Sequence, residues 1–248
     1  MLPRRFKPNK RYQKLSITVE DTKPYLLTQV QMNDSTRIQT KLLIDTGASH
    51  GLLLDAESDS KIMVPAKHIS SFIGRGLGGV ITGQVGRIKS ISIGEYTIKR
   101  VIANFPDPNS YNDSIKDIKS VYRNGSIGGE ILSRFKIIFN FPEEKVYLKK
   151  NASFGREFRY NLSGLTIRAQ GVNLRNFEIT NVRENSSAQK ANVKAGDTIL
   201  SIGGESASEL DLNGVDSMVN SNPGKRIVLE LERNGKKIRV EFVLENQI

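Results

Sequence analysis

The residues most able to do chemistry stand at the end of an apolar stretch, KLLIDTGAS, which spans residues 41–49. A carboxylate in this place must be hydrogen-bonded, paired or partly protonated, because removing a lone charge from water is very costly. Asp45 is therefore expected either to cap a turn or to act as a reactive acid. Two carboxylates that share one proton can hydrolyse a peptide bond, since one activates a water and the other protonates the carbonyl oxygen. Taken alone, however, Asp-Thr-Gly is more often a turn.

Two glycine-rich segments follow this motif. The first, GRGLGGVITG at 74–83, fits a hairpin that opens and closes over a substrate. It also matches G-x-G-x-x-G, but that nucleotide-binding fingerprint must open a helix, and β-branched residues follow here. Nucleotide binding is therefore rejected. The second segment, SIGGEIL at 126–132, joins an apolar residue to two glycines and a short helix signal.

These three segments, in this order, resemble the retropepsin-like aspartic proteases, the single-lobe relatives of pepsin, over about residues 15–150. The resemblance implies that Asp45 is the catalytic acid and that Thr46 and Gly47 brace the site. It places Ile127 and Gly128 in a ψ-shaped loop beneath the acid. It also implies a flap whose tip contains four residues: Gly76, Leu77, Gly78 and Gly79.

The chain has a single Asp-Thr-Gly, so a site with paired acids needs a second polypeptide half. Two copies could meet about a two-fold axis, each contributing Asp45. Alternatively, another lobe could precede this segment. The abrupt basic start favours the second alternative, and the bacterial proteins that the chain resembles often carry two such lobes before a C-terminal domain.

The C-terminal part, FEITNVRENSSAQKANVKAGDTILSIGGE at 177–205, resembles a PDZ domain. Such domains capture an extended peptide by adding it to a sheet between a strand and a helix. The resemblance implies a groove between 177–182 and 210–219, with a carboxylate-binding loop at 173–176. That loop reads NLRN where the family prefers Gly-Leu-Gly-Phe, and this departure weakens the case for binding a C-terminal carboxylate. Arg175 could supply a charge for the peptide terminus instead. The implied peptide-binding residues are Asn173, Leu174, Arg175, Asn176, Phe177, Ile179 and Val215.

Composition narrows the remaining functions. The chain has 248 residues and no cysteine, which removes disulfides and cysteine-based catalysis. Two histidines, His50 and His68, are too few for most zinc enzymes and are expected in surface loops. The net charge is +11, with six positive charges in the first 14 residues. No nucleic-acid-binding motif follows, so a solvated arm is favoured. No apolar run is long enough for a membrane span, and no signal peptide is visible.

The expected fold is mainly β: a retropepsin-like closed β-barrel lobe followed by a small α+β PDZ domain. The expected bounds are a basic arm at 1–14, the protease lobe at 15–152, a linker at 153–164 and the PDZ domain at 165–248. Strands are expected in the lobe at 15–20, 25–32, 37–45, 71–93, 96–105, 136–141 and 145–149, with a short helix near 114–120. In the PDZ domain we expect strands at 165–168, 177–182, 197–202, 227–232 and 237–244, and helices at 186–193 and 209–220. The last two strands are expected to form a hairpin through Asn234-Gly235, and Gly196 and Asp197 are expected to form a turn.

The sequence therefore predicts an aspartic endopeptidase that acts on proteins or peptides without a metal or other cofactor. It would need a second protease lobe, while its PDZ domain would recruit substrates. The alternative is a catalytically silent scaffold that binds peptides through the PDZ domain. No compartment is fixed by the residues, although the resemblance favours the cell envelope, the periplasm or secretion in a bacterium.

Overall fold

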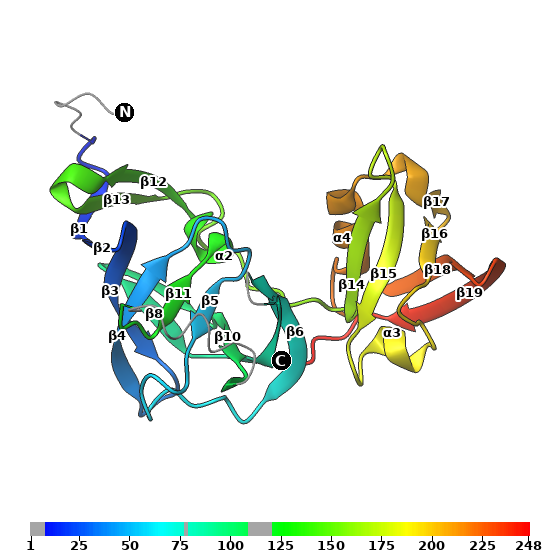
Figure 1. Cartoon of the computed structure of the whole chain (residues 1–248), viewed down its shortest axis with the longest axis horizontal. Coiled ribbons are helices and arrows are strands. Elements are labelled where there is room, and N and C mark those ends of the chain that lie inside the picture. The colour runs from blue at the N-terminus through cyan, green and yellow to red at the C-terminus, as the bar shows by residue number, and fades with distance from the viewer. Residues whose placement is uncertain (1–7, 77–78, 109–120) are drawn as a thin grey trace. The chain divides into compact units, whose positions relative to one another are not determined.

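The computed structural model describes residues 8–76, 79–108 and 121–248, and it confirms a mainly β protein (Figure 1). The chain forms two compact units, one ending at Phe158 and also including Ile248, and one running from Arg159 to Gln247. Within the described residues, no helix is long and apolar enough to cross a membrane.

The first unit is built on a ten-stranded sheet with the order β6-β7-β10-β5-β11-β4-β3-β8-β9, in which β2 also pairs with β3. This order has two ends, and no pairing among the described residues joins them, so the closed barrel stays a prediction. The strands of this sheet are β2 (Thr18–Glu20), β3 (Lys23–Gln31), β4 (Arg37–Ile44), β5 (Leu52–Leu54), β6 (His68–Gly76), β7 (Gly79–Arg87), β8 (Ser90–Ile93), β9 (Tyr96–Lys99), β10 (Ile102–Pro106) and β11 (Gly125–Ile127).

Strand β4, which leads into the Asp-Thr-Gly motif, shows why this sequence forms a half-buried strand. Its residues alternate between the core and the outer face, with Ile38, Thr40, Leu42 and Ile44 buried. A period of two is the pattern that a strand with one buried face requires. The buried Thr40 is satisfied because its hydroxyl meets that of Thr28 on β3 at 2.9 Å.

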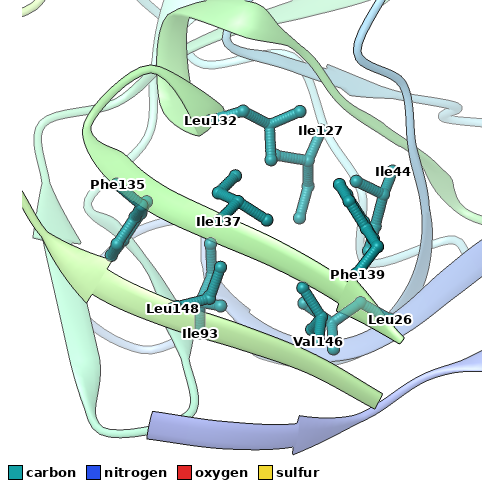
Figure 2. A pocket seen from close by; sticks show the side chains of 10 residues that line it. All are labelled: Leu26, Ile44, Ile93, Ile127, Leu132, Phe135, Ile137, Phe139, Val146 and Leu148. Carbon is teal, nitrogen blue, oxygen red and sulfur yellow. The ribbon is translucent and has the colours of Figure 1, made fainter. Parts of the chain in front are cut away.

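A second, three-stranded sheet with the order β1-β13-β12 packs on the first across an apolar cavity (Figure 2). It contains β1 (Gln13–Ser16), β12 (Phe135–Asn140) and β13 (Lys145–Lys150), with a helix α2 (Gly129–Leu132) before β12 and a 3₁₀ turn η2 (Phe141–Glu143) after it. Carbon atoms alone face the cavity. Its lining residues are Leu26, Ile44, Ile93, Ile127, Leu132, Phe135, Ile137, Phe139, Val146 and Leu148.

Two expectations for the lobe need comment. The single strand expected at 96–105 is interrupted, because Arg100 adopts a positive φ of 53° and separates β9 from β10. A left-handed residue cannot continue a strand ladder. The short helix expected near 114–120 lies outside the described residues.

The second unit contains a six-stranded sheet. Five of its strands lie side by side in the order β14-β15-β16-β18-β19, and β17 pairs with β16. The hairpin expected through Asn234-Gly235 joins β18 to β19. Side chains cap both helices: Ser186 accepts from Gln189 N–H, and Asp211 accepts from Gly214 N–H. The elements are β14 (Leu165–Gln170), β15 (Asn176–Val182), α3 (Ser187–Lys190), β16 (Thr198–Ile202), β17 (Glu205–Ser206), η3 (Ala207–Glu209), α4 (Leu212–Val219), β18 (Arg226–Arg233) and β19 (Lys236–Val243).

An ion pair between a buried aspartate and a partly exposed arginine joins the turn before β16 to the end of β18. The Asp197 carboxylate, whose side chain is 1% exposed, accepts from Arg233 Nε at 2.6 Å and from Arg233 Nη2 at 2.7 Å. It also accepts from Lys194 N–H at 2.9 Å. Sequence reasoning treated Asp197 only as a turn former, and the turn contact is present. The Arg233 contact was missed because its partner lies 36 residues away.

Replacing Asp197 by Ala is expected to destabilise the second unit by about 1.5–3 kcal/mol, because it leaves the Lys194 N–H without its acceptor and removes the charge-assisted hydrogen bonds from the partly exposed Arg233. Arg168→Ala is the control, since its ion pair with Glu178 is exposed and worth at most about 1 kcal/mol. Native-state hydrogen exchange of amides in residues 159–247 measures both effects. If the two variants lost equal free energy of unfolding, the stabilising role assigned to the Asp197–Arg233 ion pair would be wrong.

Candidate active site

Asp45 directly follows β4, and its own loop holds its carboxylate. Oδ1 accepts from Gly47 N–H at 2.9 Å and from Ala48 N–H at 3.1 Å, while Asp45 N–H donates to the carbonyl of Ile127 at 2.9 Å. The side chain is half-buried. Within residues 8–76, 79–108 and 121–248, no hydrogen bond reaches Oδ2. One oxygen therefore anchors the group and the other is available to a second reactant.

Strand β11 is inserted between the two strands that flank the Asp45 loop. It pairs with β4 in parallel, with Ile127 opposite Ile44, and with β5 antiparallel, with Ile127 opposite Leu52. The segment predicted as a ψ-shaped loop therefore lies directly beneath Asp45. Ile44, which directly precedes Asp45, and Ile127 both line the apolar cavity (Figure 2).

Glycine at position 128 is required by a close approach of two backbones. A Cβ atom there would lie 2.2 Å from the carbonyl oxygen of His50, a distance that real Cβ atoms do not show. Gly128 N–H instead donates to the carbonyl of Gly51 at 2.9 Å, and Gly129 N–H donates to that of Ala48 at 2.7 Å. These bonds tie the Asp45 loop to the start of α2.

His50 was expected in a surface loop, and the structure makes it a second link between the loop and β11. Its Nε2 lies 2.9 Å from Ser126 Oγ. Burial lowers the pKa of His50, while the Asp45 charge and the Ser126 contact partly offset that effect. The other histidine, His68, is exposed and contacts the carbonyl of Pro65.

Glu130, the second residue of α2, is an acid that sequence reasoning passed over. Its N–H donates to the carbonyl of His50 at 3.3 Å, and its carboxylate lies 4.0 Å from Arg134 Nη2. Burial raises the pKa of Glu130 to about 7, although Arg134 and Arg87 act in the opposite direction. The side chain still has 34% of its surface exposed.

The glycine-rich segment at 74–83 forms the tip of the β6–β7 hairpin. Gly76 pairs with Gly79, which has a φ of 118°, while Leu77 and Gly78 lie outside the described residues. Thr82 on β7 donates to Asp107 Oδ2 at 2.9 Å. In the described part of the chain, no hydrogen bond joins this hairpin to the Asp45 loop, so its role as a flap stays a prediction.

The peptide-binding strand expected in the PDZ domain needs correction. Strand β15 pairs with β14 on one side and with β16 on the other, so it has no free edge near Phe177. Phe177, Ile179 and Val215 are fully buried and form part of the core. Among the described residues, the edge strands of this sheet are β14 and β19, and β14 contacts α4 (Figure 1). The prediction failed because the order of strands in a sheet is not encoded locally.

The predicted carboxylate-binding loop also lies elsewhere than expected, because it follows the last residue of β14. Asn173, Leu174 and Arg175 are exposed in the turn between β14 and β15, and the exposed Asn176 is the first residue of β15. Arg175, proposed as a charge for a peptide terminus, donates instead to the carbonyl of Glu209 at 3.0 Å. The turn is at the far end of β14 from Leu165, where the strand begins.

The comparisons with known proteins agree with the two units. Residues 28–129 match the aspartyl protease family, and residues 178–233 match the PDZ domain. The chain carries an aspartyl protease domain followed by a PDZ domain. Both domains predicted from the sequence are thus confirmed, and they support a peptidase that has a peptide-binding module.

Each individual relative is similar to this chain over only part of the length of one or both proteins. The regulator of sigma-E protease RseP from Escherichia coli K12 is 33% identical over 86 residues, which is 35% of this chain and 18% of RseP. A retropepsin-like aspartic protease from Rickettsia conorii is 17% identical, covering 55% of this chain and 98% of its own, with a TM-score of 0.36. The structure of the HtrA-type protease AlgW with a decapeptide is 12% identical. The match covers 90% of this chain and 71% of that chain, with a TM-score of 0.35.

In the described residues, no three His, Asp or Glu side chains converge on one point. Two carboxylates lie near the loop that follows β4. Asp45 is fixed by backbone amides, and Glu130 is joined to the same loop through His50.

Glu130 is expected to lose its proton near pH 7. Its pKa in the folded state exceeds the ordinary value of 4.5, so the folded state binds more protons than the unfolded state between those pH values. The stabilising contribution of the protonated carboxyl is therefore complete at low pH and lost as the pH rises through about 7. A carboxyl-carbon NMR titration measures this midpoint, with Glu130→Gln identifying the resonance. A midpoint near 4.5 would contradict the burial argument.

Proposed function

We propose that Asp45 is one of two catalytic acids of an aspartic endopeptidase. The observation that carries this proposal is the Asp45 loop itself: one carboxylate oxygen is held by two amides above an inserted strand, and the other is left for a reactant. The aspartyl protease match over 28–129 includes Asp45 and the inserted strand.

The proposed mechanism needs a second carboxylate about 3 Å from Asp45, so that the pair holds one proton. The ionised acid takes a proton from a water molecule, which attacks the peptide carbonyl carbon. The protonated acid donates to the carbonyl oxygen, and the resulting tetrahedral intermediate collapses when the amine leaves with a proton. No covalent bond to the protein forms. Gly47 and Ala48 N–H groups keep Asp45 oriented throughout, because they bond only Oδ1.

The second acid has two proposed sources. A second copy of this chain could supply its own Asp45 about a two-fold axis, or a further lobe could supply a different aspartate. The hairpin at 74–83 would close over the substrate in either case. Thr46 is exposed and is proposed to brace the assembled site rather than the isolated loop.

The PDZ domain is proposed to recruit protein substrates through the free edge of β14. A segment added there would gain backbone hydrogen bonds along 166–170 and contacts with α4. The opposite edge, β19, is less suitable because three cations protect it: Lys236, Lys237 and Arg239. A cell-envelope, periplasmic or secreted location in a bacterium remains part of this proposal.

The alternative function is a silent scaffold in which the protease domain only mediates assembly. It is favoured by the single Asp-Thr-Gly, since one acid cannot form the pair. The two functions differ in one measurable property, which is cleavage that depends on Asp45.

Asp45→Asn is expected to abolish cleavage of a mixed peptide library from acidic to neutral pH, because an amide cannot accept the proton of the attacking water. Asp55→Asn is the matched control. Asp55 also follows a strand and accepts a local N–H, from Glu57 at 2.9 Å, but it lies outside the proposed site. Mass spectrometry of the library before and after incubation measures cleavage.

The source of the second acid follows from mixing the wild type with Asp45→Asn. If two copies form the site, an equal mixture retains about one quarter of the wild-type activity at the same total concentration, because only unmixed wild-type dimers are active. Retention of one half would mean that each chain acts independently of its partner's Asp45. Cleavage by neither protein would instead support the scaffold or a missing lobe.

A further inference from the structure

The free edge of β14 begins at a loop whose backbone donors are already occupied. Leu162 N–H and Ser163 N–H both donate to Asn220 Oδ1, at 2.8 and 3.3 Å. Gly164 N–H donates to Asn161 Oδ1 at 2.7 Å. The fourth amide of the run, that of Leu165, donates to Ser163 Oγ at 3.2 Å.

This loop is the place where the end of an added peptide would arrive. Strand β14 starts at Leu165, and its partner β15 runs antiparallel to it. A peptide that adds antiparallel to the other edge would therefore direct its C-terminus toward 162–165. Runs of successive backbone N–H groups are what proteins use to capture a terminal carboxylate.

Side-chain oxygens occupy the positions that a carboxylate would need. Leu162, Ser163 and Leu165 are 3%, 0% and 2% exposed, so their amides are covered as well as bonded. Asn220 is held from α4, where its N–H donates to the Asp216 carbonyl at 3.0 Å and its Nδ2 to Asp216 Oδ1 at 2.9 Å. A carboxylate could bind only by displacing an amide oxygen that is already in place and leaving it without its donors, which is costly in a buried site.

We infer that the β14 edge binds an internal extended segment of a protein chain and does not select a free C-terminus, because Asn220 and Asn161 fill the carboxylate position. This inference rests on the proposed recruiting role of the PDZ domain and specifies its ligand. Leu165 is also occupied at its carbonyl, which accepts from Asn161 Nδ2 at 2.6 Å. Along 166–170 the edge has no partner strand among the described residues, so an added segment could pair there and continue past the loop. Ile167 and Ala169 are only partly buried against the core and offer an apolar surface to alternate side chains of that segment.

The test compares pairs of short extended peptides that differ only in their last group, a free carboxylate or an amide. The full-length chain carries Asp45→Asn so that the peptides stay intact, and fluorescence anisotropy measures binding. Each pair is expected to bind with equal affinity. Adding Asn220→Ala exposes the amides of Leu162 and Ser163. The free acid is then expected to bind about tenfold more tightly than the amide, as for a charge-assisted hydrogen bond.

Asp216→Asn is the matched control, since it alters the other hydrogen bond of Asn220 but leaves the Oδ1 acceptor in place. It is expected to bind acid and amide equally. A preference for the free acid in the chain with Asn220 intact would overturn the inference while leaving recruitment by the PDZ domain standing. Failure of both peptide sets to bind would overturn the recruiting role and the inference together.

Discussion

The insertion of β11 between β4 and β5 is the constraint on which the protease domain depends. A strand from about 70 residues further along the chain must run between two strands that are close in the sequence, and Asp45 lies at the end of the first of these. Glycine at 128 permits the closest contact, because any side chain would strike the His50 carbonyl. The hydrogen bond from Asp45 N–H to Ile127 then fixes the acid relative to the inserted strand. The position of the reactive group is thus set by backbone packing.

Arg134 fixes the region on the other side of α2 from Asp45. Arg134, 4% exposed, donates through Nε to the Glu130 carbonyl and stacks 3.7 Å above the Phe158 ring. Its Nη1 also bonds backbone carbonyls of 153–156. The segment that follows β13 is therefore attached to the same short helix that carries Glu130. Burying an arginine is tolerable here because carbonyl groups satisfy its donors.

Local signals predicted much of this molecule, and non-local contacts explain what was missed. The alternation in β4, the Asn-Gly hairpin and the two helix caps are encoded by neighbouring residues, and the structure contains them. The pairing of His50 with Ser126 spans 76 residues, and that of Leu162 with Asn220 spans 58. Neither could be read from spacing. The peptide-binding groove was expected along 177–182, which the structure places inside the sheet as β15, for the same reason: strand order depends on the whole domain.

The two edges of the PDZ sheet also bear on how this protein behaves in concentrated solution. Edge strands expose unpaired amide and carbonyl groups, and lysines are a common defence against unwanted pairing. Strand β19 has that defence, whereas Arg168 is the only charged side chain on β14. An edge that accepts a guest strand also accepts the same edge of a second molecule. Self-pairing of β14 would then compete with ligand, so the ability to bind would fall as the protein is concentrated, and ligand would protect against aggregation.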